Sequence, residues 1–399
     1  MDNRETRSSE NRRSRALQNS RRNAGRRRRA RKKVALRIVI LLLLLLAAIV
    51  LVICARHYKS EKEAELKAQQ EAEQKAKEEE VYPITLRFAG DINFDDDYFP
   101  MQHFQEIGAE SISEVIDPEY VELMNKADVM WVNNEFCYTD SGEPLAGKAF
   151  TFSANPENVK YLKELGVDVA GLANNHVFDY GEQGLLDTLA TLEAAQIPYV
   201  GAGHNINEAA SPVYVKAGPL TIAYVAAERA EKVQIVTQEA TENQPGVLRC
   251  YENDRFIQSI KEAAEKADYV IALPHWGTEH ATELEDVQKD GARAYIDAGA
   301  DAVIGAHPHI LQGIEYYNGK PIVYSLGNFW FDNYELYTMV AELRLSKDES
   351  VELIIYPGIQ RNAETHPANE SERDEIFRHL EDISPQEIQI DEQGVVSGS

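Results

Sequence analysis

Side chains of the kinds that bind metal ions occur in five short clusters along the chain. Each cluster contains histidine, aspartate, glutamate or asparagine, and each follows a short apolar run. Imidazole nitrogens and carboxylate or amide oxygens are common protein ligands of divalent cations. Ordinary loop polarity does not account for five such clusters, and we predict that they meet at one metal site. The members are Asp91 and Asn93; Asn133, Asn134 and Glu135; Asn174, Asn175 and His176; His275; and His307 and His309.

The last cluster, His307-Pro308-His309, places two imidazoles close together. It follows the apolar run 302–304, which predicts a short buried strand. Pro308 disfavours a helical conformation of the residue before it. We therefore expect an extended segment, in which residues i and i+2 point the same way. The two imidazoles should then face one spot just beyond the strand.

The ligand types match a hydrolytic site that holds two divalent cations. One carboxylate can bridge two cations about 3.5–4 Å apart, while imidazoles and amide oxygens complete their coordination. Such ions polarise the bond under attack and supply hydroxide near neutral pH. A histidine beside the ligands can protonate the leaving group, and His176 is the candidate. The clusters thus favour a metal-dependent hydrolase with one or two ions of Mn, Zn or Fe.

Alternating strand and helix patterns place these clusters at the carboxyl ends of predicted strands. This alternation is typical of an α/β domain with largely parallel strands, whose functional sites lie at those ends. Asp179, Gly181 and Gly184 are expected to form the turn into the helix that follows His176. The predicted strands are 84–89, 129–132, 167–172, 222–226, 269–273, 302–304, 322–324, 338–345 and 387–390. The predicted helices are 118–126, 156–165, 182–195, 255–266, 287–298 and 370–383.

Charge divides the chain into a basic start and an acidic remainder. Residues 1–37 carry 15 Lys or Arg and 3 Asp or Glu, whereas residues 81–399 carry 20 and 55. Between them lies an uncharged apolar run that is long enough, with its flanking residues, for a membrane-spanning helix. The positive-inside rule places the basic side in the cytoplasm. We predict a single-pass plasma-membrane protein with a cytoplasmic tail at 1–33, a signal anchor at 34–55, a charged stalk at 56–81 and an extracellular domain at 82–399.

The basic tail has two interpretations. The run Arg26–Arg29 is a feature of nucleic-acid-binding segments, but a basic tail beside a membrane span also sets topology and attracts anionic lipids. We favour the second interpretation because the tail adjoins a spanning segment. We also expect no nucleic-acid partner for the folded domain, because it is placed outside the cell. Cys137 and Cys250 fall in that domain, where a disulfide is permitted. We expect both to be buried free thiols.

Together these motifs resemble a known family. The segments FAGDINF, NNEF, LANNHVFDYGEQGLLDTL, LPHWGTEH, GAHPHILQGIE and YSLGNFWFD cover roughly residues 84–332. They are similar to the motif blocks of the CapA family of poly-γ-glutamate capsule synthesis proteins, a relative of the calcineurin-like metallophosphoesterases. The resemblance implies a metallophosphatase-like four-layer α/β sandwich, preceded here by one transmembrane helix.

The resemblance also implies individual roles: two ligands of a first metal, one bridging carboxylate, three ligands of a second metal, and one acid. Asn93 stands where the phosphoesterase pattern has a histidine, which weakens the first metal position. The second block also departs from that pattern, with Asn133-Asn134-Glu135 in place of Gly-Asp and an aspartate ligand. Asn93 and Asn328 are further candidates for contacting substrate. By this resemblance, Asp91 and His309 bind the first metal and Glu135 is the bridging carboxylate. Asn175, His275 and His307 bind the second metal, and His176 is the acid.

Two functions are consistent with these features. One is a membrane-anchored, extracytoplasmic hydrolase that acts in the synthesis or processing of an anionic capsule polymer of the poly-γ-glutamate class. The other is a non-catalytic subunit that guides the polymer at a capsule synthase or export complex. The acidity of residues 81–399 disfavours a long polyanion-binding groove and favours recognition centred on a cation. The implied partners are the membrane, synthase or export subunits, and the anionic polymer.

Overall fold

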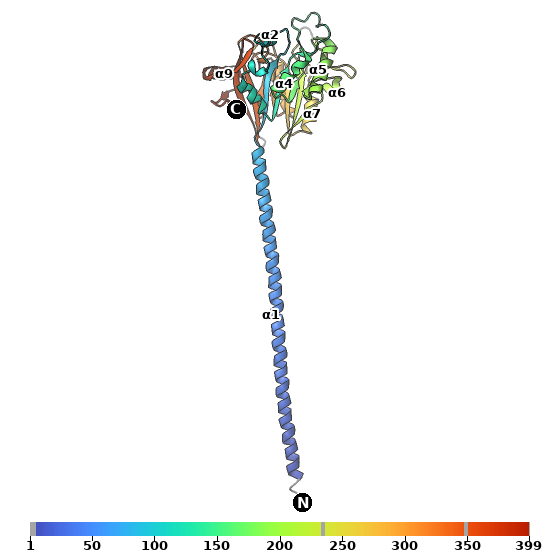
Figure 1. Cartoon of the computed structure of the whole chain (residues 1–399), viewed down its shortest axis with the longest axis vertical. Helices are drawn as coiled ribbons and strands as arrows, with labels where there is room; N and C mark the ends of the chain where they lie inside the picture. The colour runs from blue at the N-terminus through green and yellow to red at the C-terminus, as the bar shows by residue number, and fades with distance from the viewer. Residues whose placement is uncertain (1–4, 233–235, 347–349, 399) are drawn as a thin grey trace. The chain divides into compact units, whose positions relative to one another are not determined.

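The computed structural model describes residues 5–232, 236–346 and 350–398. The chain divides into two compact units, Met1–Glu80 and Val81–Ser399. Helix α1 (Glu5–Val81) forms the first unit (Figure 1). It runs through the predicted tail, span and stalk, apart from residues 1–4, which lie outside the described part. The helix is long and apolar enough to cross a membrane, and its large apolar side chains between Val34 and Ile53 are 48–70% exposed.

Two β-sheets form the centre of the second unit. The larger has ten strands, in the order β19-β20-β17-β16-β1-β2-β5-β6 with β15 on β1 and β18 on β17. Its strands are β1 (Ile84–Ile92), β2 (Val129–Asn134), β5 (Val169–Gly171), β6 (Tyr199–Val200), β15 (Asn328–Trp330), β16 (Leu336–Leu345), β17 (Val351–Arg361), β18 (Glu364–Pro367), β19 (Ile388–Ile390) and β20 (Val395–Gly398).

The smaller sheet has six strands in the order β13-β14-β12-β11-β9-β8. Its strands are β8 (Val213–Ala217), β9 (Leu220–Glu228), β11 (Tyr269–His275), β12 (Ala302–Ile304), β13 (Ile314–Tyr317) and β14 (Lys320–Val323). The two sheets share one buried apolar cluster, in which the rings of Phe88 on β1 and Tyr224 on β9 lie 6.3 Å apart. The sheets therefore pack face to face.

Helices cover the outer face of each sheet (Figure 1). Apolar side chains of α2 (Phe99–Glu106), α3 (Pro118–Asn125), α4 (Val159–Glu164) and α5 (Gly181–Ala195) pack on the large sheet. Those of α7 (Asp254–Ala264) and α8 (Asp286–Asp297) pack on the small sheet. This order of helix, sheet, sheet and helix confirms the predicted four-layer α/β sandwich. The remaining helices are α6 (Ile206–Ala209) and α9 (Glu370–Ile383), and two-stranded ribbons pair β3 (Cys137–Tyr138) with β4 (Ser153–Ala154) and β7 (Ala202–Gly203) with β10 (Gly246–Val247).

The prediction of largely parallel strands is wrong for half of the large sheet. β1, β2, β5 and β6 are parallel, but β16 runs antiparallel to β1 and β17 antiparallel to β16. The sequence pattern misses β17 because Pro357 and Gly358, which usually interrupt strands, lie in the middle of it. The helix predicted at 156–165 is divided into a 3₁₀ turn (Pro156–Asn158) and α4.

Candidate metal centre

Parallel strands from both sheets bring the predicted ligands to one place. Asp91 is the second-last residue of β1, and Glu135 directly follows β2. Asn175 follows β5 in the same sheet, and His275 ends β11 in the other. The pair after β12 completes the set. All of the predicted metal ligands are buried, with at most 7% of their surface exposed: Asp91, Glu135, Asn175, His275, His307 and His309.

Glu135 lies at the centre of this cluster. One ligand atom from each of Asp91, Glu135 and His275 lies within 4.8 Å of the others, and the same holds for Glu135, His307 and His309. The Nε2 atoms of His275 and His309 are 3.6 and 3.9 Å from Glu135 Oε1. A carboxylate shared by two groups of ligands is in the position of a bridge between two cations.

Several ligand atoms make no hydrogen bond within the described residues, and this pattern fits a bound cation. Asn133 Nδ2 donates to Asp91 Oδ1 at 2.7 Å and to Glu135 Oε2 at 2.8 Å. The other oxygen of each carboxylate, together with His307 Nδ1, is buried without a hydrogen bond. Buried polar atoms without a partner are costly. One or two divalent cations bound around Glu135 would compensate these atoms.

The electrostatics of the cluster agree with this donor set. Burial, followed by the charge of Asp91, raises the pKa of Glu135 well above its usual range. Burial lowers the pKa of His275 and His307 well below the usual imidazole value. The two imidazoles are therefore neutral, which is the form that binds metal ions. Burial and repulsion from Asp91 thus disfavour the charged form of Glu135.

His309 differs from the other two imidazoles. Burial alone would lower its pKa, but contacts with Asp91 outweigh burial and raise the pKa above the usual value. Its Nδ1 lies 3.2 Å from Asp91 Oδ2 and 2.8 Å from Asn328 Oδ1. Asn328 in turn donates to Asp332 at 2.9 Å. Asn328, predicted as a pocket residue, thus contacts a predicted ligand directly.

The extended conformation expected for His307-Pro308-His309 is wrong. His307 has a φ of 100° and His309 a φ of 61°, so both lie in the left-handed region. Non-glycine residues rarely adopt such angles, and they cluster at functional sites. The imidazoles nevertheless converge, with ring centroids 5.9 Å apart. The turn of the backbone, and not strand alternation, directs them to one place.

Asparagine side chains support the ligands, and two of them, Asn133 and Asn174, were predicted in the clusters without an individual role. Asn133 accepts a hydrogen bond from Asn174 Nδ2 at 3.1 Å while it binds both carboxylates. Asn175 Oδ1 lies 2.8 Å from His275 Nε2. Asn93, by contrast, uses its side-chain oxygen to accept from the Asp95 backbone N–H, and its Nδ2 is buried without a partner. The place of Asn133 and Asn174 in the clusters beside predicted ligands is the signal that points to this supporting role.

His176 belongs to a chain of hydrogen bonds beside the cluster. Its Nδ1 lies 2.7 Å from Asp179 Oδ2, and Lys148 Nζ lies 2.5 Å from Asp179 Oδ1. Lys148 also donates to the backbone carbonyl of Asn175. Burial, against the opposing charge of Asp179, lowers the pKa of His176. Asp179 therefore does more than form the turn expected from the sequence, and no motif pointed to Lys148.

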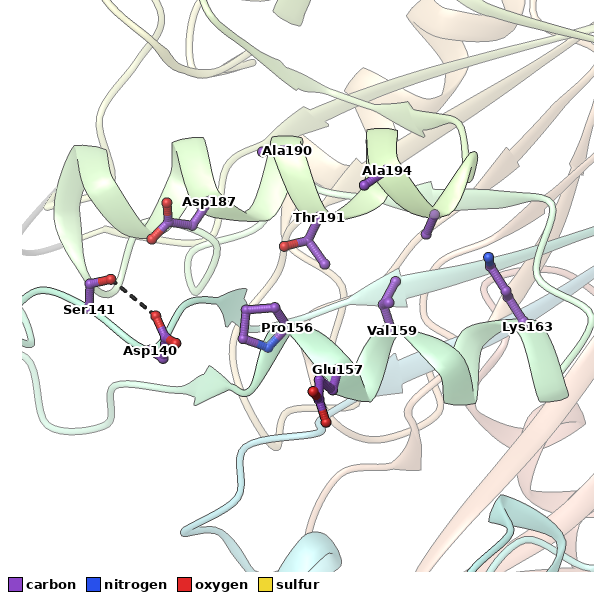
Figure 2. Close-up of a pocket in the computed structure, with 11 residues that line it drawn as sticks. Asp140, Ser141, Pro156, Glu157, Val159, Lys163, Asp187, Ala190, Thr191 and Ala194 are labelled. Atoms are coloured by element: carbon purple, nitrogen blue, oxygen red, sulfur yellow. Dashed lines mark hydrogen bonds between the residues drawn. The ribbon is translucent and has the colours of Figure 1, made fainter.

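A cavity of about 370 Å³ opens next to this centre, lined by Asn175, His307, Lys232, Thr278 and Glu279 among others. A separate pocket of about 600 Å³ lies between α4 and α5. Figure 2 shows Asp187 and Thr191 of α5 across from Pro156 and Val159 in this second pocket, which contains none of the predicted site residues. Cys137 and Cys250 are buried free thiols, as expected.

Comparisons with known proteins agree with the sequence motifs. Residues 85–333 match the family model described as "Bacterial capsule synthesis protein PGA_cap". "PGA biosynthesis protein CapA" of Bacillus subtilis (strain 168) is 38% identical over 230 residues, which is 57% of this chain and 58% of that protein. "Probable polyglutamine synthesis accessory protein Rv0574c" of Mycobacterium tuberculosis (strain ATCC 25618 / H37Rv) is 35% identical over 218 residues, 52% of this chain and 56% of that protein. The chain thus spans little more than half the length of these relatives.

Among solved structures, a hypothetical protein from Thermus thermophilus is similar over 69% of this chain and 98% of its own, with 15% sequence identity and a TM-score of 0.43.

Proposed function

The chain belongs to the bacterial capsule synthesis protein family PGA_cap, and we propose that its folded domain is a metal-dependent hydrolase. The bond cleaved would be a phosphoester or a related bond in the synthesis or processing of an anionic cell-surface polymer of the poly-γ-glutamate class. One observation carries this proposal: Asp91 and His307 are buried on either side of Glu135, and each of the three has a ligand atom that makes no hydrogen bond.

The residues of the metal centre would have different roles. Asp91, Glu135, His275, His307 and His309 would hold one or two divalent ions, with the amide oxygen of Asn175 as a further ligand. When bound, the ions would polarise the bond under attack and supply hydroxide near neutral pH. Asn133 holds the two carboxylates in place.

The acid–base step falls to His176. It would deliver a proton to the leaving group, because a histidine beside the ligands that is oriented by a carboxylate can act as a general acid. Asp179, 2.7 Å away, orients the ring and stabilises its protonated form. Phe152, whose ring centroid is 4.5 Å from that of His176, limits access of water on one side.

Metal content tests the centre directly. The full-length protein, purified in detergent, should contain Mn, Zn or Fe by elemental analysis. Glu135→Ala and His309→Ala should each lose most of that metal, because each removes a ligand. His204→Ala is the matched control. The His204 side chain is about half exposed, contacts Glu208 and lies outside the predicted motifs. Unchanged metal content in both ligand variants would disprove the proposal.

A second candidate is a polymer-guiding subunit without catalysis. The observation in its favour is Asn93, which occupies a position where the phosphoesterase pattern has a histidine and whose side-chain oxygen is already used at Asp95. Turnover of a model phosphodiester by the metal-loaded protein, abolished in His176→Ala, would exclude this candidate. Metal binding without turnover of phosphodiesters or γ-glutamyl polymers would favour it.

For location, the proposal is a single-pass plasma-membrane protein whose domain faces outward and whose partners include capsule synthase or export subunits. The support is the apolar part of α1 and the strongly basic sequence before it. Protease added to intact cells should degrade the domain and spare the N-terminal tail. Protection of the domain until the cells are lysed would reverse the proposed orientation.

A further inference from the structure

A patch of aromatic side chains connects the metal centre to the protein surface. We define the aromatic patch as Tyr98, Phe99, Phe150, Phe152, Phe331 and Tyr334. Phe150 and Tyr334 are each 61% exposed, and Phe99 is 41% exposed. In the described part of the domain, four Phe or Tyr side chains are exposed, and Tyr214 is the one outside the patch. Exposed apolar side chains that gather at one place mark binding sites.

Ring contacts join the patch to two histidines of the centre. Phe152 lies 4.5 Å from His176, and Phe331 lies 4.6 Å from His309, between ring centroids. Tyr98 packs on Phe152 at 4.7 Å and approaches Phe331 at 6.1 Å. Any molecule held at the metal ligands would therefore have these aromatic rings within reach of its neighbouring groups.

Most charged side chains around the patch are acidic, and Lys148, shortly before Phe150 in the sequence, is paired with Asp179. The patch comes from three segments, 93–107, 149–158 and 328–337, which together contain seven Asp or Glu and no Lys or Arg. Asp97 lies exposed beside Tyr98. Burial raises the pKa of Tyr98 to about 12, and the charges of Asp332 and Asp95 add to this effect. A polyanion would be repelled here.

Aromatic faces combined with carboxylates are suited to one class of ligand. The face of an aromatic ring carries partial negative charge and attracts ammonium groups, quaternary ones in particular. Nearby carboxylates add to that attraction. We propose that the aromatic patch binds an ammonium group of the substrate, so that the molecule processed at the metal centre carries a positive charge next to the group held by the metals. The claim that the bound molecule is the substrate rests on the proposed hydrolase function. Binding of the ammonium group to the patch does not require metal.

Choline and its neutral carbon isostere, 3,3-dimethylbutan-1-ol, test the proposal on the full-length protein by ligand-observed NMR titration. Choline should bind and the isostere should bind much more weakly, because the two differ in charge and hardly in shape. Phe150→Ala and Tyr334→Ala should each weaken choline binding by about two- to fivefold. Tyr214→Ala, an exposed tyrosine on β8, should leave it unchanged. Equal binding of choline and isostere, or equal loss in Tyr214→Ala, would overturn the proposal.

A second measurement distinguishes this inference from the proposed function. Glu135→Ala should lose metal and turnover but retain choline binding. If the wild-type protein holds no metal yet binds choline through the patch, the hydrolase proposal fails and the cation site stands. If metal and turnover are present, p-nitrophenyl phosphocholine should be preferred over the 3,3-dimethylbutyl ester in kcat/KM, with the preference lost in Phe150→Ala/Tyr334→Ala. A preference that survives in that double variant, or tighter binding of a neutral saccharide such as chitotriose than of choline, would refute the ammonium assignment.

Discussion

Strand β1 carries two buried charged side chains that the fold treats in different ways. Arg87 is paired completely: its Nε and Nη2 each lie 2.7 Å from Glu342 Oε2, and it also donates to the backbone carbonyl of Leu123. Asp91, four residues further on, keeps one oxygen without a hydrogen bond, as does Glu135 beside it. The same sheet thus satisfies one buried charge with protein groups and leaves the other open. This difference supports the proposal that Asp91 and Glu135 bind a metal ion.

Removal of Glu342 should give the largest effect. In Glu342→Ala, Arg87 remains buried without its partner, which costs about 3–5 kcal/mol of unfolding free energy. Urea denaturation followed by tryptophan fluorescence would measure the loss, since all three tryptophans are buried.

Two variants serve as controls for this experiment. Glu352→Ala removes a partner of Arg344 that is 45% exposed, and it should cost less than about 1 kcal/mol. Arg87→Met/Glu342→Leu removes both buried charges and should recover most of the stability. A loss below about 1 kcal/mol in Glu342→Ala would mean that the complete pairing of Arg87 contributes little.

Glu228 is an intermediate case between these two. It is fully buried at the end of β9, with Oε1 accepting from the Ala230 N–H, while Oε2 has Arg249 Nε 3.6 Å away and no hydrogen bond. Burial raises its pKa from 4.5 to about 7. Between those values the folded state keeps a proton that the unfolded state releases. The stabilisation is therefore complete below pH 4.5 and is lost as the pH rises to 7, by up to about 3 kcal/mol.

Glu228→Gln should abolish this pH dependence. The measurement is unfolding free energy at several pH values between 4.5 and 7, in excess chelator so that metal binding does not contribute. The difference between wild type and variant isolates Glu228 from other titrating groups. A difference that stays constant across this range would contradict the assignment of a raised pKa to Glu228.

Metal bound at Asp91, Glu135 and the neighbouring histidines should raise the unfolding free energy by less than the loss expected in Glu342→Ala. A cation present at about 100 times its dissociation constant adds about 2.7 kcal/mol to the folded state, so a chelator should lower the Tm of the wild-type protein. Glu135→Ala should be insensitive to chelator. Glu135→Ala should also be as stable as the chelated wild type. Unlike Glu342→Ala, which leaves Arg87 buried without its partner, this variant leaves no buried Lys or Arg unpaired. An equal response of both proteins to chelator would show that the cluster does not hold the ion.

The sequence predicts much of this site because its ligands sit at strand ends. Short runs such as 302–304 are predicted at their observed bounds, and parallel strands bring their carboxyl ends together whatever the loops between them do. The same argument cannot give the backbone of His307 and His309, whose left-handed φ values depend on packing around the turn. The antiparallel β17 is also missed, because Pro357 and Gly358 obscure a strand that its neighbours in the sheet stabilise.

Residues that position the ligands are harder to predict than the ligands themselves. Asn133 and Asn174 lie next to predicted ligands in sequence, so their role follows once the strands are assembled. Lys148 contacts Asn175, which is 27 residues away in the sequence, and Asp179, which is 31 residues away. Its neighbours in the sequence show no motif. Contacts of this kind arise from the tertiary fold and have no local pattern.

Substitution of Lys148 should have the smallest effect of the changes considered. Lys148 is a cation held between Asp179 and the Asn175 carbonyl, and its charge contributes to the low pKa of His176, after burial and against the opposing effect of Asp179. Lys148→Met should reduce kcat/KM by roughly tenfold, about 1.4 kcal/mol, because a charge-assisted hydrogen bond to each partner is lost. The pKa of His176 should rise, so the fall in activity on the alkaline side should move to higher pH.

Lys148→Arg separates charge from packing. It keeps the cation beside Asp179 and should restore the wild-type pH profile even if the rate recovers only in part. Metal content should remain unchanged in both variants, because Lys148 is not a ligand and Asp91 and Glu135 keep their Asn133 contacts. A loss of metal in Lys148→Met would instead show that the open cluster depends on this lysine, and that Asn175 is held in place mainly through its backbone carbonyl.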